Sequence, residues 1–190
     1  MTTDTTDTTD AIGTLLVLSG PPGSGKTTVA RALAEGADRA TVHLATDVFY
    51  VAIRKGFVQP FLPEAAKQNE VVIDVIVAAM TGYAKGGYDV VDVIVGPWSL
   101  PQFVSGARRG GLDLSFVVLR PSFDETFARA VARVGKELKA SGPIRGLYGA
   151  FAKLGALEGH VIDMTGETVD ATTRRVRQGL VAGEFALSAG

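Results

Sequence analysis

The sequence predicts an α/β protein in which a five-stranded parallel sheet carries helices on both faces and a small lid. Two observations predict this class. Short apolar runs alternate along the chain with longer amphipathic stretches, which is the pattern of buried strands connected by helices. Five of these runs are each followed by a stretch of helical type, so the strands are expected to form one doubly wound sheet. Ligands of such sheets bind beyond the carboxyl ends of the strands.

Local sequence features explain several breaks between the expected elements. The Gly86-Gly87 pair ends the longest expected helix, and Pro121 follows the fourth strand, where it cannot interrupt the hydrogen-bond ladder. The expected strands are residues 14–19, 41–45, 89–95, 114–119 and 160–163. The expected helices are residues 25–35, 63–85, 100–109, 122–139, 144–154 and 168–180.

The 190 residues have the length of one ordinary domain. The chain opens with "MTTDTTDTTD", a polar repeat without an apolar signal-type segment, and we expect residues 1–11 to be a disordered tail. Residues 12–190 are expected to form a single domain, with the lid at about residues 120–146.

Composition excludes several classes of protein and partner. A formal net charge of -1 offers no electrostatic basis for nucleic acid or an anionic membrane as the main partner. The chain has no cysteine, which excludes disulfides, thiolate metal sites and a cysteine nucleophile. Its most apolar windows, residues 71–80 and 90–95, are too short to span a bilayer. We expect a cytoplasmic protein.

The segment "GPPGSGKT", residues 20–27, fits the pattern G-x-x-x-x-G-K-[ST] between an expected strand and an expected helix. Its glycines allow backbone N–H groups to turn inward around phosphate oxygens. Lys26 is expected to reach the β- and γ-phosphates of a nucleotide, and the Thr27 hydroxyl to bind Mg²⁺. The residues expected to bind the nucleotide are Gly20, Pro21, Gly23, Ser24, Gly25, Lys26, Thr27 and Thr28.

Missing motifs narrow the kind of nucleotide-binding protein. No Asp-Glu pair follows a strand, and no length remains for the helical domain of a motor protein. The transporter signature Leu-Ser-Gly-Gly-Gln and the guanine motif Asn-Lys-x-Asp are also absent. Among nucleotide-binding proteins with this loop, these absences leave the compact kinases as the expected class.

A carboxylate follows the second expected strand, in "VHLATDVFY". We expect Asp47 to lie beside the phosphate loop, where it could accept the proton of an acceptor hydroxyl or orient a water molecule on Mg²⁺. The structural alternative is that Asp47 caps the N-terminus of a helix. Both roles are compatible.

A second carboxylate, Asp92, interrupts the aliphatic run of the third strand. If the strand ends at about Val91, Asp92 faces the cleft and takes a catalytic role. If the strand continues to Val95, Asp92 lies within the sheet and the cleft begins at Gly96-Pro97. The cost of burying an ionised carboxylate favours the first interpretation.

Phosphoryl transfer needs further positive charge near the transferring group. Arg129 and Arg133 are four residues apart on one face of an expected helix, so both could reach the phosphates. Alternatively, these arginines belong to a solvated basic face.

These residues resemble the small P-loop phosphotransferases, which include chloramphenicol phosphotransferase and shikimate- or gluconate-kinase-like proteins and are often labelled AAA-family ATPases. The resemblance covers about residues 13–182 and rests on the loop "GPPGSGKTT", Asp47, Asp92, the arginine-bearing helix and the last strand "HVIDMTGE". It implies a P-loop NTPase fold that uses ATP and Mg²⁺.

The resemblance also implies roles for individual residues. Asp47 would be the catalytic base or an acceptor ligand, and Arg129 or Arg133 would hold ATP phosphates or stack on adenine. Thr165-Gly166 would lie near the base. The chain departs from the group at Asp92-Val93, where relatives commonly have Asp-Gly or Asp-Asp, so the duty of Asp92 stays open.

Candidates for the acceptor site are Phe49, Tyr50, Arg54, Phe57, Phe61 and Trp98, although aromatic residues at such spacing also form ordinary core. The leading hypothesis is an ATP-dependent phosphotransferase that transfers the γ-phosphate to a hydroxyl of a small molecule, either a metabolite or an antibiotic. A second is an ATP-binding switch or resistance protein that hydrolyses slowly and binds a ligand or partner without phosphorylating it. A third is a kinase-like toxin acting on nucleotide sugars.

Overall fold

The computed structural model describes residues 11–94, 96–132 and 141–187. The tail expected at the N-terminus falls almost wholly outside them. Five strands form one parallel sheet in the order β2-β3-β1-β4-β5, which confirms the predicted fold class. The strands are β1 (Leu15–Ser19), β2 (Thr41–Ala45), β3 (Asp89–Val93), β4 (Leu114–Leu119) and β5 (Val161–Ile162).

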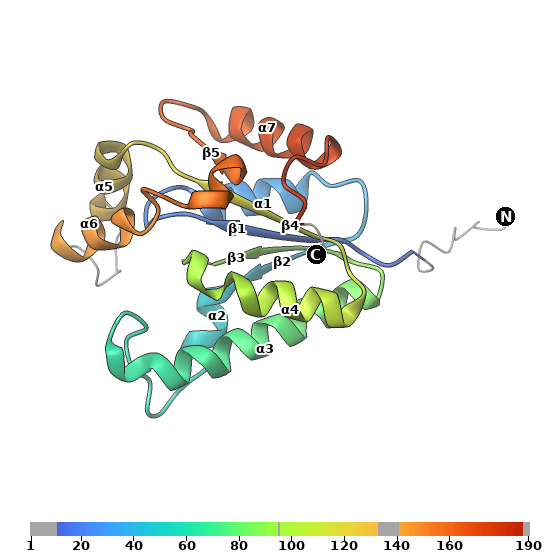
Figure 1. Ribbon diagram of the computed structural model, residues 1–190, viewed down its shortest axis with the longest axis horizontal. Coiled ribbons are helices and arrows are strands. Elements are labelled where there is room, and N and C mark those ends of the chain that lie inside the picture. Colours follow the sequence, from blue (N-terminus) through green and yellow to red (C-terminus); the bar gives the residue numbers. More distant parts are fainter. Residues whose placement is uncertain (1–10, 95, 133–140, 188–190) are drawn as a thin grey trace, which may run out of the picture.

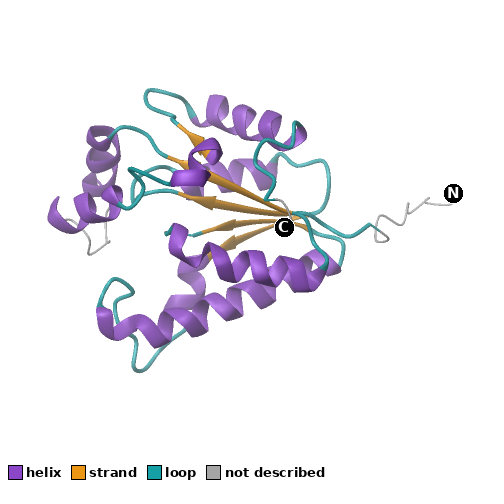
Figure 2. Cartoon of the chain, in the orientation of Figure 1, coloured by secondary structure: helices purple, strands orange, loops and turns teal. Residues whose placement is uncertain are grey.

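Helices cover both faces of this sheet, as Figures 1 and 2 show. Helices α3 and α4 lie on one face, and α1 and α7 lie on the other (Figure 1). The helices are α1 (Lys26–Glu35), α2 (Thr46–Val51), α3 (Ala66–Lys85), α4 (Leu100–Gly110), α5 (Phe123–Ala132), α6 (Ser141–Gly149) and α7 (Val169–Val181). Short 3-10 turns η1 (Pro63–Ala65), η2 (Pro97–Ser99) and η3 (Gly155–His160) connect them. None of the described helices is long and apolar enough to cross a membrane.

The central strand β1 shows why its sequence is apolar throughout. Leu15 and Val17 belong to the core that packs against α3 and α4, whereas Leu16 and Leu18 belong to the core against α1 and α7. Successive side chains of a strand point to opposite faces, so a strand covered on both faces needs an unbroken apolar run. "LLVLS" meets that requirement, and all five of its residues are buried.

The structure corrects several expected element boundaries. Helix α2 is absent from the expected helices, although the alternative for Asp47 allowed a helix to begin there; it has six residues, and its N-cap residue Ala45 makes no side-chain capping bond. The expected helix over 122–139 is observed as α5, and its second half lies outside the described residues. Helix α6 begins and ends earlier than the expected helix over 144–154.

Near the C-terminus, residues 185–187 also join the sheet unexpectedly, through an antiparallel bridge between Ser115 and Ala186. Leu187 N donates to Leu114 O in the same contact.

Candidate functional site

The glycine-rich loop lies between β1 and α1, at the carboxyl edge of the central strand (Figure 1). Lys26 is the first residue of α1 and is buried. Its Nζ donates hydrogen bonds to the backbone oxygens of Gly20 at 2.7 Å and Pro21 at 3.0 Å. No side chain caps the first turn of α1, although the N–H groups of Thr28 and Val29 both donate to the backbone oxygen of Gly25 at 3.0 Å. The loop thus encloses an ammonium group beside an uncapped helix N-terminus, and this combination is suited to binding phosphate.

Two pairs of hydroxyl groups lie within this loop or directly beside it. Ser19 and Ser24 are fully buried, and their Oγ atoms have no hydrogen-bond partner among the described residues. A buried hydroxyl without a partner is costly, so a bound anion that accepts from Ser24 would relieve that cost. Thr27 and Thr28, in the first turn of α1, are exposed. Their hydroxyls are therefore accessible to a ligand or a hydrated metal ion.

Helix α5 packs directly onto the phosphate loop at Gly23. A Cβ atom at Gly23 would lie 2.2 Å from the backbone oxygen of Thr126 and 3.1 Å from the backbone nitrogen of Ala130. Gly23 also has a φ of 93°, a conformation that side chains disfavour. The loop and the helix that bears Arg129 can therefore approach so closely only because this residue is glycine.

Substituting Gly23→Ala should accordingly destabilise the protein more than Gly56→Ala. Gly56 has a similar φ of 80° but nothing within 4 Å of its added Cβ, so it isolates the backbone cost, about 1–2 kcal/mol. The clash with α5 should add about 1–3 kcal/mol at Gly23. Urea unfolding of both variants measures the difference. Equal losses would show that α5 does not press on the loop.

Asp47 lies in the first turn of α2 and is exposed. The N-cap residue is Ala45, so the alternative that Asp47 caps the helix is wrong. In the sheet, Ala45 pairs with Val93, which pairs with Leu18 on the strand that leads into the phosphate loop. Because β3 separates β2 from β1, Asp47 is not immediately beside the loop. Two strand spacings of about 4.8 Å separate the chains.

Asp92 lies inside β3, where it pairs with Val17 and Leu44, and its side chain is fully buried. The interpretation in which the strand ends at about Val91 is therefore wrong. The strand continues to Val93, and residue 95 lies outside the described part.

The buried carboxyl of Asp92 has few polar contacts. The Val93 N–H donates to Oδ1 at 2.7 Å, and Thr46 Oγ1 lies 3.5 Å from that oxygen, while Oδ2 has no hydrogen-bond partner among the described residues. Burial raises the pKa of Asp92 from 3.8 to about 7, against the opposing effect of the contacts from Val93 and Thr46. The sheet therefore accommodates Asp92 largely as a neutral acid at mildly acidic pH, which avoids the desolvation cost that the sequence argument assumed.

The raised pKa of Asp92 predicts a pH-dependent stability that Asp92→Asn removes. The folded protein keeps this proton up to about pH 7, whereas the unfolded chain loses it near pH 3.8, so stability falls as pH rises through this window. Between about pH 5.5 and about pH 8 the wild-type protein should lose about 2 kcal/mol more than Asp92→Asn. Denaturant unfolding at both pH values tests this, with the exposed Asp74→Asn as control. Parallel pH profiles for wild type and Asp92→Asn would contradict it.

Of the two arginines expected to reach the phosphates, the structure describes one. Arg129 Nη2 donates to Glu125 Oε1, one turn earlier in α5. The Arg129 side chain is 38% exposed and that of Glu125 is 23% exposed. Arg133 lies outside the described residues. Arg129 therefore projects from the helix that contacts the phosphate loop and is held by a carboxylate.

The other described arginines of this region have structural contacts. Arg120 forms an ion pair with Glu158 at 2.8 Å and donates to the backbone oxygen of Phe151 at 2.6 Å. The guanidinium of Arg145 lies over the ring of Phe123, 4.3 Å from its centroid. The first two contacts join the end of β4 to η3 and to the segment after α6, and the third joins α6 to α5.

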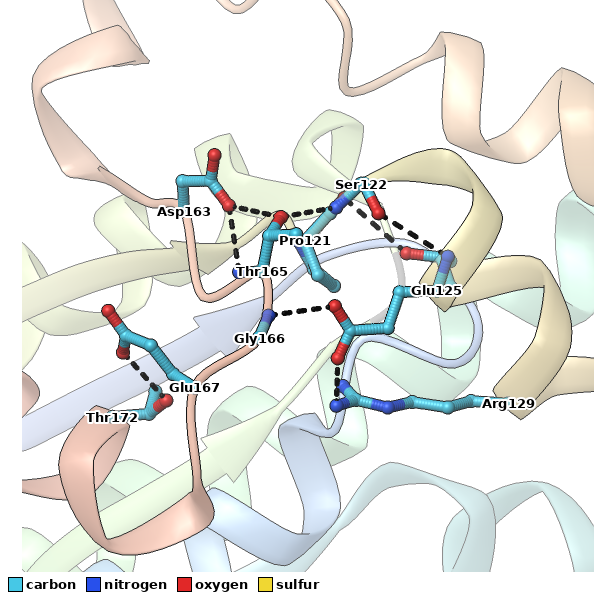
Figure 3. A network of polar contacts seen from close by, with 10 residues as sticks. Pro121, Ser122, Glu125, Arg129, Asp163, Thr165, Gly166, Glu167 and Thr172 are labelled. Carbon is cyan, nitrogen blue, oxygen red and sulfur yellow. Dashed lines mark hydrogen bonds and ion pairs between the residues drawn. The ribbon is translucent and has the colours of Figure 1, made fainter.

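The turn after β5, which contains Thr165 and Gly166, is tied to the start of α5 (Figure 3). The Ser122 N–H donates to Thr165 Oγ1 at 2.8 Å, and the Gly166 N–H donates to Glu125 Oε2 at 3.0 Å. Thr165 in turn donates to Asp163 through its hydroxyl and its N–H, and these bonds lower the pKa of Asp163. The turn expected near the base is therefore rigidly joined to the helix that carries Arg129.

Sequence reasoning missed Ser122 and Glu125. Both contacts join segments far apart in the chain, and no local pattern marks them. The only local signal was the spacing of Glu125 four residues before Arg129, which is common in ordinary helices.

Of the six acceptor candidates, two are partly buried and four, Phe57 and Phe61 among them, are exposed. Phe49 and Tyr50 are partly buried and pack against the hydrophobic core, as the structural alternative expected. Arg54 is exposed, and Trp98 is 59% exposed in η2, just beyond the end of β3. Two surface cavities lie along α3 instead, and neither is lined by Asp47 or Trp98.

A parallel sheet in this order, with a glycine-rich loop leading into the helix after its central strand, defines the P-loop NTPase fold. The sequence profile of a family described as AAA domain matches residues 16–145, which is more than half of the chain. The chain therefore belongs to this AAA domain family. A comparison with curated proteins finds no significant match.

Solved structures with the same fold include several kinases. A sugar kinase from Janibacter sp. superposes with a TM-score of 0.67 at 15% identity, covering 89% of this chain and 95% of that chain. The tunicamycin resistance protein of Deinococcus radiodurans has a TM-score of 0.67 at 16% identity, covering 93% and 99%. Shikimate kinase from Acinetobacter baumannii, in complex with shikimate, has a TM-score of 0.64 at 19% identity, covering 90% and 94%. At these identities the similarity shows the fold alone.

Proposed function

We propose that the protein is an ATP-dependent phosphotransferase that transfers the γ-phosphate of ATP to a hydroxyl of a small molecule. One observation carries the proposal. The phosphate loop, with Lys26 buried inside it, and the exposed carboxylate of Asp47 stand at the same edge of the sheet, two strands apart. A phosphate-binding loop alone would serve any nucleotide-dependent protein, whereas the added carboxylate supplies a group that can act on an acceptor hydroxyl.

Several observations support ATP and Mg²⁺ as the bound species. The loop offers an ammonium group, an uncapped helix N-terminus and the unpartnered hydroxyl of Ser24, all of which suit phosphate oxygens. The exposed hydroxyl of Thr27 would bind Mg²⁺, and Asp47 would hold it through a water molecule. The metal ion would neutralise charge on the phosphates. The full set proposed to bind the nucleotide is Gly20, Pro21, Gly23, Ser24, Gly25, Lys26, Thr27, Thr28, Arg129 and Thr165.

The catalytic roles follow from these positions. Asp47 would accept the proton of the acceptor hydroxyl or orient that hydroxyl for attack. Lys26 and Arg129 would stabilise the charge on the transferring group. Arg133 is proposed for the same role, although it lies outside the described residues. Asp92 contacts Thr46, the residue before Asp47, and would support the start of α2 from within the sheet.

The acceptor surface proposed here includes exposed apolar side chains on an ordered loop. The amide of Gln68 makes two hydrogen bonds to the backbone of Val58, at 2.9 and 2.7 Å, and fixes the loop to α3. On either side of Val58, the large apolar side chains of Phe57 and Phe61 are 41% and 54% exposed. With Trp98 also exposed, these side chains favour an acceptor that has an apolar surface as well as a hydroxyl.

Mass spectrometry of a metabolite extract tests the proposal. The extract, supplemented with a panel of hydroxyl-bearing antibiotics, is incubated with the protein and γ-labelled ATP. A compound that gains one labelled phosphate only with active protein supports the phosphotransferase. If ATP is consumed and no compound gains phosphate, the protein is a slowly hydrolysing switch or resistance protein instead.

A further inference from the structure

Glu125 makes contacts that the roles above do not explain. One carboxylate oxygen accepts from Arg129 Nη2 and the other accepts from the Gly166 N–H at 3.0 Å (Figure 3). The two partners belong to different parts of the proposed nucleotide site. Arg129 would reach the phosphates, and the Thr165-Gly166 turn would face the base. A single side chain thus joins the two ends of the site.

The surroundings of Glu125 make this connection rigid. The Ser122 N–H bonds to Thr165 beside the Gly166 contact, so the turn meets α5 at two points. In the same helix, the backbone of Thr126, directly after Glu125, and that of Ala130 pack on Gly23 of the phosphate loop. Helix α5 is therefore in contact with both the phosphate loop and the turn after β5, and Glu125 bonds across that junction.

The ion pair between Glu125 and Arg129 would not by itself indicate a positioning role for Glu125. Pairs of this spacing on an exposed helix surface contribute little to stability and occur widely. The bond to Gly166 is different because it satisfies a backbone N–H on a separate segment and uses the second oxygen of the same carboxylate. A guanidinium has five N–H donors, so Arg129 keeps others for a phosphate while Nη2 is held.

We propose that Glu125 is a positioning residue that orients Arg129 and the Thr165-Gly166 turn together, so that recognition of the base and of the phosphates are coupled. The proposal rests on the nucleotide site of the proposed function. Glu125 itself would not touch the transferring phosphate. It acts by holding the guanidinium over the loop and by fixing the turn in one position.

Calorimetric titration with Mg-ATP and with inorganic triphosphate and Mg²⁺ tests this coupling. Glu125→Ala should weaken Mg-ATP binding about tenfold and Glu125→Gln by a smaller factor, because each loses a charged hydrogen bond that fixes Arg129. Glu125→Gln keeps an oxygen for Gly166 and should be the milder variant. Inorganic triphosphate lacks a base, so the affinity of each variant for triphosphate should fall less than its affinity for Mg-ATP. In an Arg129→Ala background, Glu125→Gln should no longer affect inorganic triphosphate.

Glu158→Gln is the matched control. Glu158 also accepts from an arginine, Arg120, and from a backbone N–H, that of Leu154 at 2.8 Å, and within the described part of the chain neither partner is a proposed nucleotide-binding residue. The Glu158→Gln substitution should lower the melting temperature about as much as Glu125→Gln does. It should leave the Kd of Mg-ATP within about twofold of the wild-type value.

Two results would overturn the proposal. One is an unchanged Kd in Glu125→Gln, which makes the carboxylate a simple helix contact. The other is a tighter Kd, which means that Glu125 competes with the phosphates for Arg129. The test is separable from the proposed function. If the wild-type protein binds Mg-ATP and shows this pattern but phosphorylates no acceptor, the positioning role stands and the phosphotransferase fails. If the wild-type protein does not bind Mg-ATP, both fail.

Discussion

Replacing Lys26 with alanine is expected to lower phosphoryl transfer about 1,000-fold, since it removes a preorganised positive charge from the transferring group. The structure adds a second effect. Lys26 Nζ bonds to the backbone of Gly20 and Pro21, so its loss also removes the contacts that close the phosphate loop. Nucleotide affinity and transfer should therefore fall together. Calorimetry with Mg-ATP and a coupled assay of ADP release measure the two effects.

Lys85→Ala is the control for this variant. Lys85 is exposed at the end of α3, at the opposite end of the strands from the phosphate loop. The Lys85→Ala variant should bind Mg-ATP and release ADP like the wild-type protein. Retention of full activity in Lys26→Ala would remove the loop from the mechanism.

Asp47→Asn should separate nucleotide binding from transfer. Asparagine keeps the shape of the side chain but is not a base, so transfer should fall about 100- to 10,000-fold. The Kd of Mg-ATP should change little, because the phosphate loop lies two strands away and stays intact, and the asparagine oxygen can still accept a hydrogen bond from a water molecule on Mg²⁺. Calorimetry gives the Kd of Mg-ATP, and the rate at which the acceptor becomes phosphorylated gives kcat for the same protein sample.

Asp170→Asn provides a matched control for Asp47→Asn. Asp170 is also an exposed acidic residue in the first turn of a helix, α7. Any general effect of removing a negative charge from a helix N-terminus appears in both variants. Equal kcat values for Asp47→Asn and the wild-type protein would exclude Asp47 as the base.

The phosphate loop and the sheet could be predicted because both have strong local signals. Eight consecutive residues carry the loop motif, and the apolar runs of β1 and β4 identify buried strands without any tertiary information. Such signals depend only on neighbouring residues. The fold class and the position of Lys26 at the start of α1 followed from them.

The features that were missed depend on contacts across the fold. The sequence "DVVDVIV" does not show where β3 ends, because a strand boundary is set by its neighbours in the sheet. The cost of burying an ionised carboxylate led us to expect Asp92 outside the strand. Its raised pKa means that the carboxyl group can be neutral, and a neutral carboxyl group can lie inside the strand. The bond from Gly166 to Glu125 similarly exists only once β5 and α5 are adjacent.

In the proposed reaction, the γ-phosphate passes to an acceptor hydroxyl and not to water. The most direct test is to run the reaction with its identified acceptor in water enriched in oxygen-18 and to analyse the phosphate by mass spectrometry. For a phosphotransferase we expect as much phosphorylated acceptor as ADP, and no oxygen-18 in the phosphate of that product. Inorganic phosphate carrying one solvent oxygen for every ADP formed, with no phosphorylated acceptor, would contradict it.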